Sequence, residues 1–244
     1  MESITGLGKH IKCKEEHHSV STLWVGIDIG STTVKIAAID PESRDILFWR
    51  YLRHNASQAK SILKLLEMVH QEFPDAHISL AACGSGSEPI VERIGGAFVQ
   101  EVIAISIAIK SLYPQIRTAI ELGGQDAKIM VFNHDKKTGT SKLTDMRMNG
   151  SCAGGTGAFI DQMAVLLGIG IEDFNELASK GRKVHSISGR CGVFAKGDIL
   201  PLINLGIPRE DIALSVFHAV ANQTICSLAQ GIEIVSPIAF MGGP

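Results

Sequence analysis

Apolar and polar residues alternate along the first part of the chain, and helical spacing then takes over. Val25, Ile27 and Ile29 alternate with smaller or polar residues, and this period of two predicts a strand. Between 57 and 73, apolar residues recur three and four positions apart up to Pro74, which predicts a helix. The same reasoning predicts strands at 23–29, 34–39, 77–83, 116–122, 127–132 and from 238 onward, and helices at 101–112, 155–167, 172–180, 193–204 and 209–230.

Strands and helices alternate up to residue 150, and the chain is mostly helical after it. This mixture predicts an α/β fold. The 25 glycines are about a tenth of the 244 residues, above the usual share of ~7%. They indicate many tight backbone turns, a kind of turn that often binds phosphate groups.

One short segment occurs twice. Asp28-Ile-Gly-Ser-Thr-Thr-Val-Lys-Ile36 matches Glu121-Leu-Gly-Gly-Gln-Asp-Ala-Lys-Ile129, and from 28 to 121 the offset is 93 residues. In each copy an acidic residue ends a strand, a glycine turn follows, and a lysine (Lys35 or Lys128) begins the next strand. The repeat predicts two related halves.

The two turns carry the candidate chemistry. Backbone N–H groups of a glycine turn, together with serine and threonine hydroxyls, can bind a phosphate chain. Asp28 and Glu121 at the strand ends can hold Mg²⁺ through water and orient an attacking water, and Gln125 is a third catalytic candidate. Phosphate contacts are predicted for Gly30, Ser31, Thr32, Thr33, Lys35, Gly123 and Gly124. A purely structural duplication is the alternative, in which the lysines only cap their strands.

Charge and apolar runs exclude several classes of protein. The 23 Lys and Arg residues against 25 Asp and Glu give a formal net charge of −2, which argues against non-specific nucleic-acid binding. The longest apolar run, 102–109, is far shorter than the ~18 residues of a membrane span, so no span is predicted. The polar N-terminus does not resemble a signal peptide. Five scattered cysteines therefore favour a reducing cytoplasm over a disulfide framework.

Cys152 and Cys191 have similar surroundings, since each stands just before a predicted helix. The positive end of a helix dipole favours a thiolate or an anionic cluster there. Neither cysteine belongs to a Cys-x-x-Cys pair, so zinc is disfavoured. Two thiolates cannot complete a four-thiolate site, but two chains can, as in a [4Fe–4S] cluster on a two-fold axis. If the turns are left aside, each of these two cysteines is also consistent with a small buried apolar residue. Cys226 falls on the predicted helix 209–230 with Ile212, Val216 and Ala219, and we expect it to pack in the core.

The turns resemble the phosphate segments of the actin, sugar kinase and Hsp70 ATPase superfamily. Phe240-Met-Gly-Gly243 looks like the start of the adenosine segment of that superfamily, with Gly242 and Gly243 near the nucleotide. The resemblance implies a two-lobed α/β fold of duplicated ribonuclease H-like halves, with ATP between the lobes. The expected organisation is an extension at 1–22, a first lobe at 23–115 and a second lobe at 116–244.

The cysteine segments narrow the resemblance. Met148-Asn-Gly-Ser-Cys152-Ala-Gly-Gly-Thr-Gly-Ala-Phe-Ile-Asp161 and Cys191-Gly-Val-Phe-Ala195 are similar to activators of 2-hydroxyacyl-CoA dehydratases and to ATPase subunits of benzoyl-CoA reductase, the BadF/BadG/BcrA/BcrD ATPase family. The family implies a homodimer in which Cys152 and Cys191 of each subunit hold one shared [4Fe–4S] cluster. It also implies that Gly154, Gly155 and Thr156 border the nucleotide. Glu121 departs from the family, which usually has Asp there.

The family further implies an activity and partners. ATP hydrolysis would change the angle between helices at the cluster, and one low-potential electron would pass from reduced ferredoxin or flavodoxin to a dehydratase or acyl-CoA reductase. The chain also resembles the first unit of longer members that carry two such units, which would offer a second unit as the cluster partner. Two alternatives stay open: a cluster-free small-molecule kinase of the same fold, and a non-catalytic nucleotide-sensing module.

Overall fold

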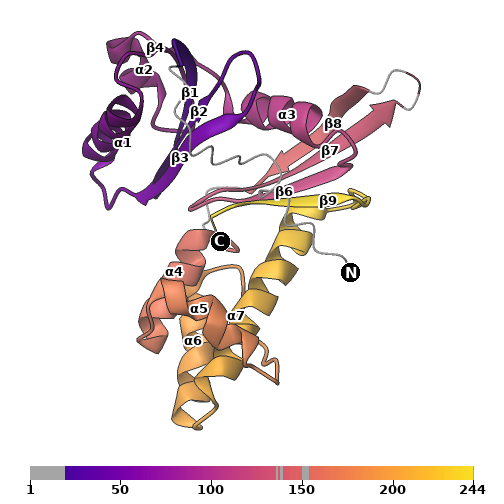
Figure 1. Ribbon diagram of the computed structural model, residues 1–244. Coiled ribbons are helices and arrows are strands. Elements are labelled where there is room, and N and C mark those ends of the chain that lie inside the picture. Colours follow the sequence, from indigo (N-terminus) through magenta and orange to yellow (C-terminus); the bar gives the residue numbers. More distant parts are fainter. Residues whose placement is uncertain (1–19, 136, 138–139, 150–153, 244) are drawn as a thin grey trace. The chain divides into compact units, whose positions relative to one another are not determined.

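The computed structural model describes residues 20–135, 137, 140–149 and 154–243 (Figure 1). The chain divides into two compact units, Met1–Ile105 and Ser106–Pro244. The boundary falls inside helix α3 (Glu101–Leu112). The lobe boundary expected at 115/116 and the extension at 1–22, which falls mostly outside the described residues, stay predictions.

The first unit is a five-stranded sheet with helices against one face. Its strand order is β3-β2-β1-β4-β5, with β1, β2 and β3 antiparallel and β4 and β5 parallel to β1. Ile62, Leu65 and Val69 of α1 pack on the inward residues of β1 and β2, and Figure 1 shows α1 alongside these strands. The elements are β1 (Thr22–Ile29), β2 (Thr33–Ile39), β3 (Ile46–Arg53), α1 (Gln58–Glu72), β4 (His77–Cys83), α2 (Glu88–Ile94) and β5 (Ala97–Phe98).

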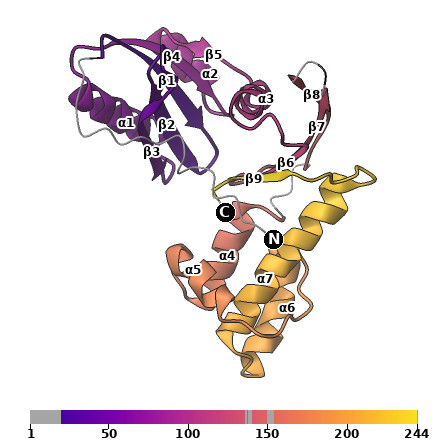
Figure 2. The ribbon, with the colours of Figure 1, turned by 45° about the vertical axis from the view of Figure 1, so that its right-hand side comes forward.

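The second unit combines a four-stranded sheet with a helical bundle, which Figure 2 shows beside the sheet. The strand order is β8-β7-β6-β9, and β9 runs parallel to β6. The helices pack on one another through apolar side chains such as Phe159, Ile199 and Val216. The elements are β6 (Thr118–Leu122), β7 (Ala127–Asp135), β8 (Thr140–Met148), α4 (Gly157–Leu167), α5 (Ile171–Ser179), α6 (Gly192–Asn204), α7 (Arg209–Thr224), the π-helix η2 (Ile225–Ala229) and β9 (Ile238–Gly242).

The α/β prediction is confirmed, and the repeated segment forms an equivalent motif in both units. Each copy is an antiparallel hairpin, β1–β2 or β6–β7. A parallel strand, β4 or β9, pairs with the first strand of each hairpin. The alternation of apolar residues did not identify β3, β8 or α2. In β3 the aromatic residues Trp49 and Tyr51 are exposed while Phe48 is buried, so polarity does not mark its buried face.

The helix that α7 and η2 form together bears on two expectations. Within the described residues, Arg209–Ala229 is long and apolar enough to cross a membrane by length and composition alone, although half of its most apolar stretch is buried. Its apolar residues do not form one uninterrupted run, because Ser215, His218 and Asn222-Gln-Thr224 stand between them. Its buried residues Ile212 and Val220 belong to the core of the helical bundle. Cys226, expected in the core from a regular helical period, is exposed, because the π-helix shifts that period.

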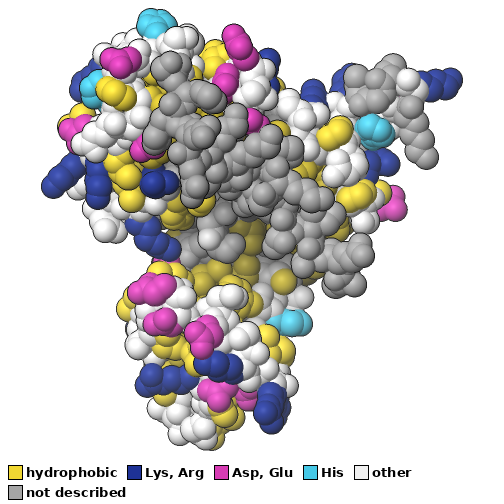
Figure 3. Space-filling model, in the orientation of Figure 1, with side chains coloured by type: hydrophobic (Ala, Val, Ile, Leu, Met, Phe, Trp, Pro, Cys, Tyr) yellow, Lys and Arg dark blue, Asp and Glu magenta, His cyan; other side chains and the backbone are white. Residues whose placement is uncertain are grey.

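Charged side chains of both signs are interspersed over the helices of the second unit, on the face that Figure 3 draws. This distribution agrees with the near-balanced formal charge of −2. A single-sign field of the kind that attracts nucleic acid does not form on the helices of this face.

Candidate functional site

The first turn, residues 30–33, joins β1 to β2 and is closed by its own backbone. Gly30 N–H donates to the carbonyl of Thr33 at 2.9 Å. Asp28 and Lys35 face each other across the two strands, and Lys35 Nζ donates to Asp28 Oδ2 at 2.6 Å. Thr33 is buried, while Ser31 and Thr32 are half-buried. The structure therefore brings all the residues predicted for the first half into one turn and its flanks.

The second turn, residues 123–126, repeats this geometry in the other unit. Gly123 N–H donates to the carbonyl of Asp126 at 2.7 Å, and Lys128 Nζ donates to Glu121 Oε2 at 2.9 Å. Gln125 is exposed in this turn. The repeat seen in the sequence thus extends to the closing hydrogen bond and to the ion pair.

Each hairpin is also flanked by a glycine that no other residue could replace without strain. Gly84 follows β4 with φ +94°, and a Cβ there would collide with the carbonyl of Ile29. Gly242 ends β9 with φ +116°, and a Cβ there would collide with the carbonyl of Leu122. Ile29 and Leu122 occupy the same position of the repeat. Strands β4 and β9 therefore approach the two hairpins in the same way. Gly243, the other glycine predicted near the nucleotide, directly follows β9.

The two carboxylates differ in their surroundings. The Asp28 side chain is 25% exposed and that of Lys35 is 35% exposed, whereas Glu121 and Lys128 are 11% and 4% exposed. Asp28 Oδ1 is buried and has no hydrogen-bond partner among the residues that the structure describes. A buried acceptor without a partner is costly unless water or a cation supplies one.

Helix α4 begins directly on the second turn. The N–H groups of Gly157 and Ala158 donate to the carbonyls of Gly123 (2.9 Å) and Gly124 (2.7 Å). The N-cap residue Thr156 is fully buried. The structure therefore connects the predicted segment 154–156 to the second turn.

Two residues that the sequence reasoning missed also hold the turns. His54, which follows β3, contacts the carbonyl of Gly30 through its ring. Asn149, which follows β8, contacts the backbone of residues 125 and 127 through its side chain. No local sequence signal marks them, because they follow β3 and β8, two strands that the alternation of apolar residues did not identify.

Cys191 is the N-cap of α6, and its carbonyl accepts the N–H of Ala195 at 3.0 Å. The segment before it packs tightly on Gly154, where a Cβ would collide with the carbonyl of Arg190. Cys152 lies outside the described residues, and its role as a cluster ligand stays a prediction. Within the described part of the chain, no three His, Cys, Asp or Glu side chains gather in a group that could hold a metal ion.

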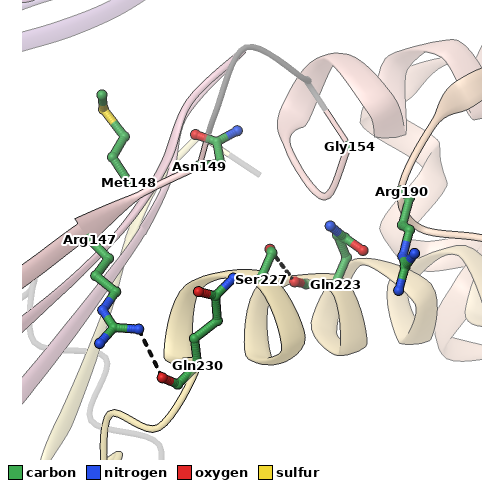
Figure 4. A pocket seen from close by; sticks show the side chains of 8 residues that line it. All are labelled: Arg147, Met148, Asn149, Gly154, Arg190, Gln223, Ser227 and Gln230. Carbon is green, nitrogen blue, oxygen red and sulfur yellow. Dashed lines mark hydrogen bonds between the residues drawn. The ribbon is translucent and has the colours of Figure 1, made fainter.

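A pocket of about 410 Å³ lies in the second unit, beside the segment that leads to Cys191. Figure 4 shows the end of β8 on one side of it and the helix formed by α7 and η2 on the other. Arg147 donates to the carbonyl of Gln230 at 2.9 Å across this space. The lining residues are Arg147, Met148, Asn149, Gly154, Arg190, Gln223, Ser227 and Gln230.

Comparisons with known proteins agree on one group. The profile of the BadF/BadG/BcrA/BcrD ATPase family matches residues 25–244. The (R)-2-hydroxyglutaryl-CoA dehydratase activating ATPase of Acidaminococcus fermentans is 30% identical over 227 residues, which cover 92% of this chain and 84% of the relative.

Two solved structures share the fold. The crystal structure of component A of that Acidaminococcus fermentans dehydratase superposes with a TM-score of 0.77 and 29% identity, over 91% of this chain and 83% of the other. The activator of the 2-hydroxyisocaproyl-CoA dehydratase from Clostridium difficile, solved with bound ADPNP, gives a TM-score of 0.76 and 25% identity, over 91% and 80%.

Proposed function

Because this chain belongs to the BadF/BadG/BcrA/BcrD ATPase family, we propose that it hydrolyses ATP to deliver one low-potential electron to a 2-hydroxyacyl-CoA dehydratase or a related acyl-CoA reductase. The observation that carries the proposal is the pair of matched turns, each with an acidic residue, a lysine and the same closing hydrogen bond. A solved relative has bound ADPNP, an ATP analogue.

The turns are proposed to bind the phosphates of ATP. Backbone N–H groups of residues 31–33 and 124–126 supply donors, since those of Gly30 and Gly123 close the turns, and Ser31, Thr32 and Thr33 add hydroxyls. Lys35 adds a positive charge beside the first turn, although it also pairs with Asp28. The segment 154–156 and the glycines 242 and 243 are proposed to border the sugar and base of ATP.

Asp28 and Glu121 are proposed to hold Mg²⁺ through water and to orient the attacking water, and Gln125 of the second turn is proposed as a third catalytic residue. The buried and unpartnered Oδ1 of Asp28 fits this role, since a water molecule would satisfy that oxygen. Lys128 holds Glu121 Oε2 at 2.9 Å and so fixes the orientation of the second carboxylate.

Cys152 and Cys191 are proposed as ligands of a [4Fe–4S] cluster that two chains, or two units of a longer chain, share. Cys191 fits a cluster ligand, because an N-cap position places its sulfur at the positive end of α6. A bound cluster supplies a one-electron carrier whose potential depends on charge and exposure. The proposed electron donor is reduced ferredoxin or flavodoxin, and the proposed compartment is the reducing cytoplasm.

ATP hydrolysis by site variants, measured on anaerobically purified protein, tests the proposal. We expect Asp28→Asn and Glu121→Gln to lower the rate by ~100-fold or more, in the range of a lost acid–base group. Glu176→Gln is the matched control, since Glu176 is an exposed partner of Lys180 on α5. Wild-type rates in both site variants would overturn the catalytic assignment. No hydrolysis by the iron-loaded wild type would overturn the ATPase.

A further inference from the structure

We infer that His54 and Asn149 are positioning residues, which turn the backbone carbonyls of the two turns away from the phosphates so that the N–H groups face them. The inference rests on the proposed function, because it assumes that the turns bind a nucleotide. It assigns a role to two side chains that belong to different units and that the repeated segment does not contain.

The hydrogen bonds of His54 define its tautomer. Nδ1 lies 3.1 Å from the N–H of Ala56 and accepts from it, so the ring proton is on Nε2. Nε2 lies 3.3 Å from the carbonyl oxygen of Gly30 and therefore donates to it. The backbone N–H of His54 donates to the carbonyl of Thr32 at 3.2 Å. With 7% of its surface exposed, His54 ties two carbonyls of the first turn to the end of β3.

The Gly30 carbonyl has a second donor. Nε2 of Gln58, the first residue of α1, lies 3.4 Å from the same oxygen. In a planar trans peptide the C=O and the following N–H point in opposite directions. Donors that hold the Gly30 carbonyl on one side therefore turn the N–H of Ser31 to the other side.

In the second turn, three consecutive carbonyls are held from outside. Gly157 and Ala158 of α4 donate to the carbonyls of Gly123 and Gly124. Asn149 Nδ2 donates to the carbonyl of Gln125 at 3.3 Å, while its Oδ1 accepts the N–H of Ala127 at 2.7 Å. By the same peptide geometry, the three N–H groups that follow these carbonyls point the other way. Successive N–H groups on one side form a nest for anions.

His54 and Asn149 occupy equivalent places. Each directly follows the third strand of its hairpin sheet, β3 or β8, and each donates its own N–H to the neighbouring strand or turn, at 3.2 Å to Thr32 and 2.9 Å to Ala127. Thr32 and Gln125 are equivalent positions of the repeat, and their carbonyls are held by the His54 backbone N–H and by the Asn149 side chain. The carbonyls of the equivalent residues Gly30 and Gly123 are held by the His54 ring and by α4. A packing role alone would not select a side chain with one donor and one acceptor at both places.

Two isosteric substitutions separate the roles of the two ring nitrogens. Glutamine can place an amide N–H near the Nε2 position, and asparagine can place its amide near Nδ1. His54→Gln should therefore keep the bond to Gly30, and His54→Asn should lose it. The readouts are the dissociation constant for Mg-ATP and the thermal midpoint of each variant. His134→Asn is the control, because His134 is half-buried on β7 of the other unit and its ring contacts the Ser141 hydroxyl.

We expect His54→Asn to weaken Mg-ATP binding about fivefold to tenfold, the effect of one hydrogen bond of ~1 kcal/mol. His54→Gln should stay within about twofold of the wild type, although both variants lose ring packing and unfold at lower temperature. Equal affinities in the two variants would overturn the inference. If wild type itself binds no Mg-ATP, the proposed function fails first.

Asn149→Ala tests the second half independently of whether the His54 variants fold. It removes the donor to Gln125, so Mg-ATP binding should weaken about fivefold. Asn133→Ala on β7 is the matched control, since Asn133 is exposed. Wild-type affinity in Asn149→Ala, with wild-type binding intact, would overturn the inference for this turn.

Discussion

At the residue scale, the two ion pairs of the repeat are alike in geometry and unlike in burial. Lys128 and Glu121 are almost enclosed, at 4% and 11% side-chain exposure, and Lys35 and Asp28 are partly solvated. A solvated pair is weakened by water and salt, whereas an enclosed charge depends on its partner. We therefore expect the ion pair of the same sequence motif to contribute differently to the free energy of unfolding in the two halves.

Replacing each lysine with methionine tests this difference. Lys128→Met removes the 2.9 Å ion pair from the buried Glu121 carboxylate, and we expect a loss of about 3–5 kcal/mol in the free energy of unfolding. Lys35→Met should cost no more than ~1 kcal/mol, since Asp28 is partly solvated. Urea unfolding of the two variants measures both values. Equal losses would show that burial does not separate the pairs.

At the element scale, the helices of the second unit are connected by side chains that cap loop backbone. Asp211, in the first turn of α7, accepts the N–H groups of Arg182 and Lys183 at 2.7 and 3.1 Å. The bond from Arg182, then that from Lys183, lowers the pKa of the Asp211 carboxyl below its usual 3.8. The carboxylate therefore fastens the segment after α5 to the start of α7.

The lowered pKa gives a pH dependence of known sign. The folded state holds the Asp211 proton less tightly than the unfolded state does, so the stabilisation is present above the unfolded pKa and is lost as pH falls through the folded pKa. Asp211→Asn should lower the thermal midpoint at neutral pH and should flatten its decline between about pH 4 and pH 2. A decline as steep as in the wild type would exclude Asp211 as the titrating group.

The elements also show where sequence patterns succeed and fail. The strands predicted at 23–29 and 34–39 and the helices predicted at 155–167, 172–180 and 193–204 are confirmed to within two residues, because each buries one regular face. The helix predicted at 209–230 is confirmed as α7 up to Thr224. Strand β3 was missed because exposed aromatic residues hide its period. The exposure of Cys226 was missed because a π-helix breaks the period of 3.6 on which the prediction rested.

At the scale of the whole molecule, the chain contains the same hairpin motif twice, once in each unit. The acids, glycines and lysines of the two turns could be predicted because they repeat in sequence. His54 and Asn149 could not, because the residues that hold a turn come from a third strand 20 or more positions away and differ between the halves. Their role depends on long-range strand pairing, which no local pattern records.

The shared cluster is the prediction that belongs to this scale, since it requires more than one unit. Cys152→Ala and Cys191→Ala should each lose bound iron and acid-labile sulfide after anaerobic purification, because a four-thiolate site then lacks ligands. Cys226→Ala should keep the wild-type content, since Cys226 is exposed on η2. The wild type should hold about two irons per chain if two chains share one four-iron cluster. Full iron content in either ligand variant would contradict the assignment.

Helix α4 starts on the second turn, and this gives two amide protons an unusual meaning. Amides at the start of a helix have no carbonyl of their own helix to bind. Those of Gly157 and Ala158 bind the carbonyls of the turn instead. Their exchange with deuterium therefore follows the opening of the turn and not the unwinding of the helix. Hydrogen exchange at these two amides thus reports how often the turn opens, and it can be measured in the intact protein with and without nucleotide.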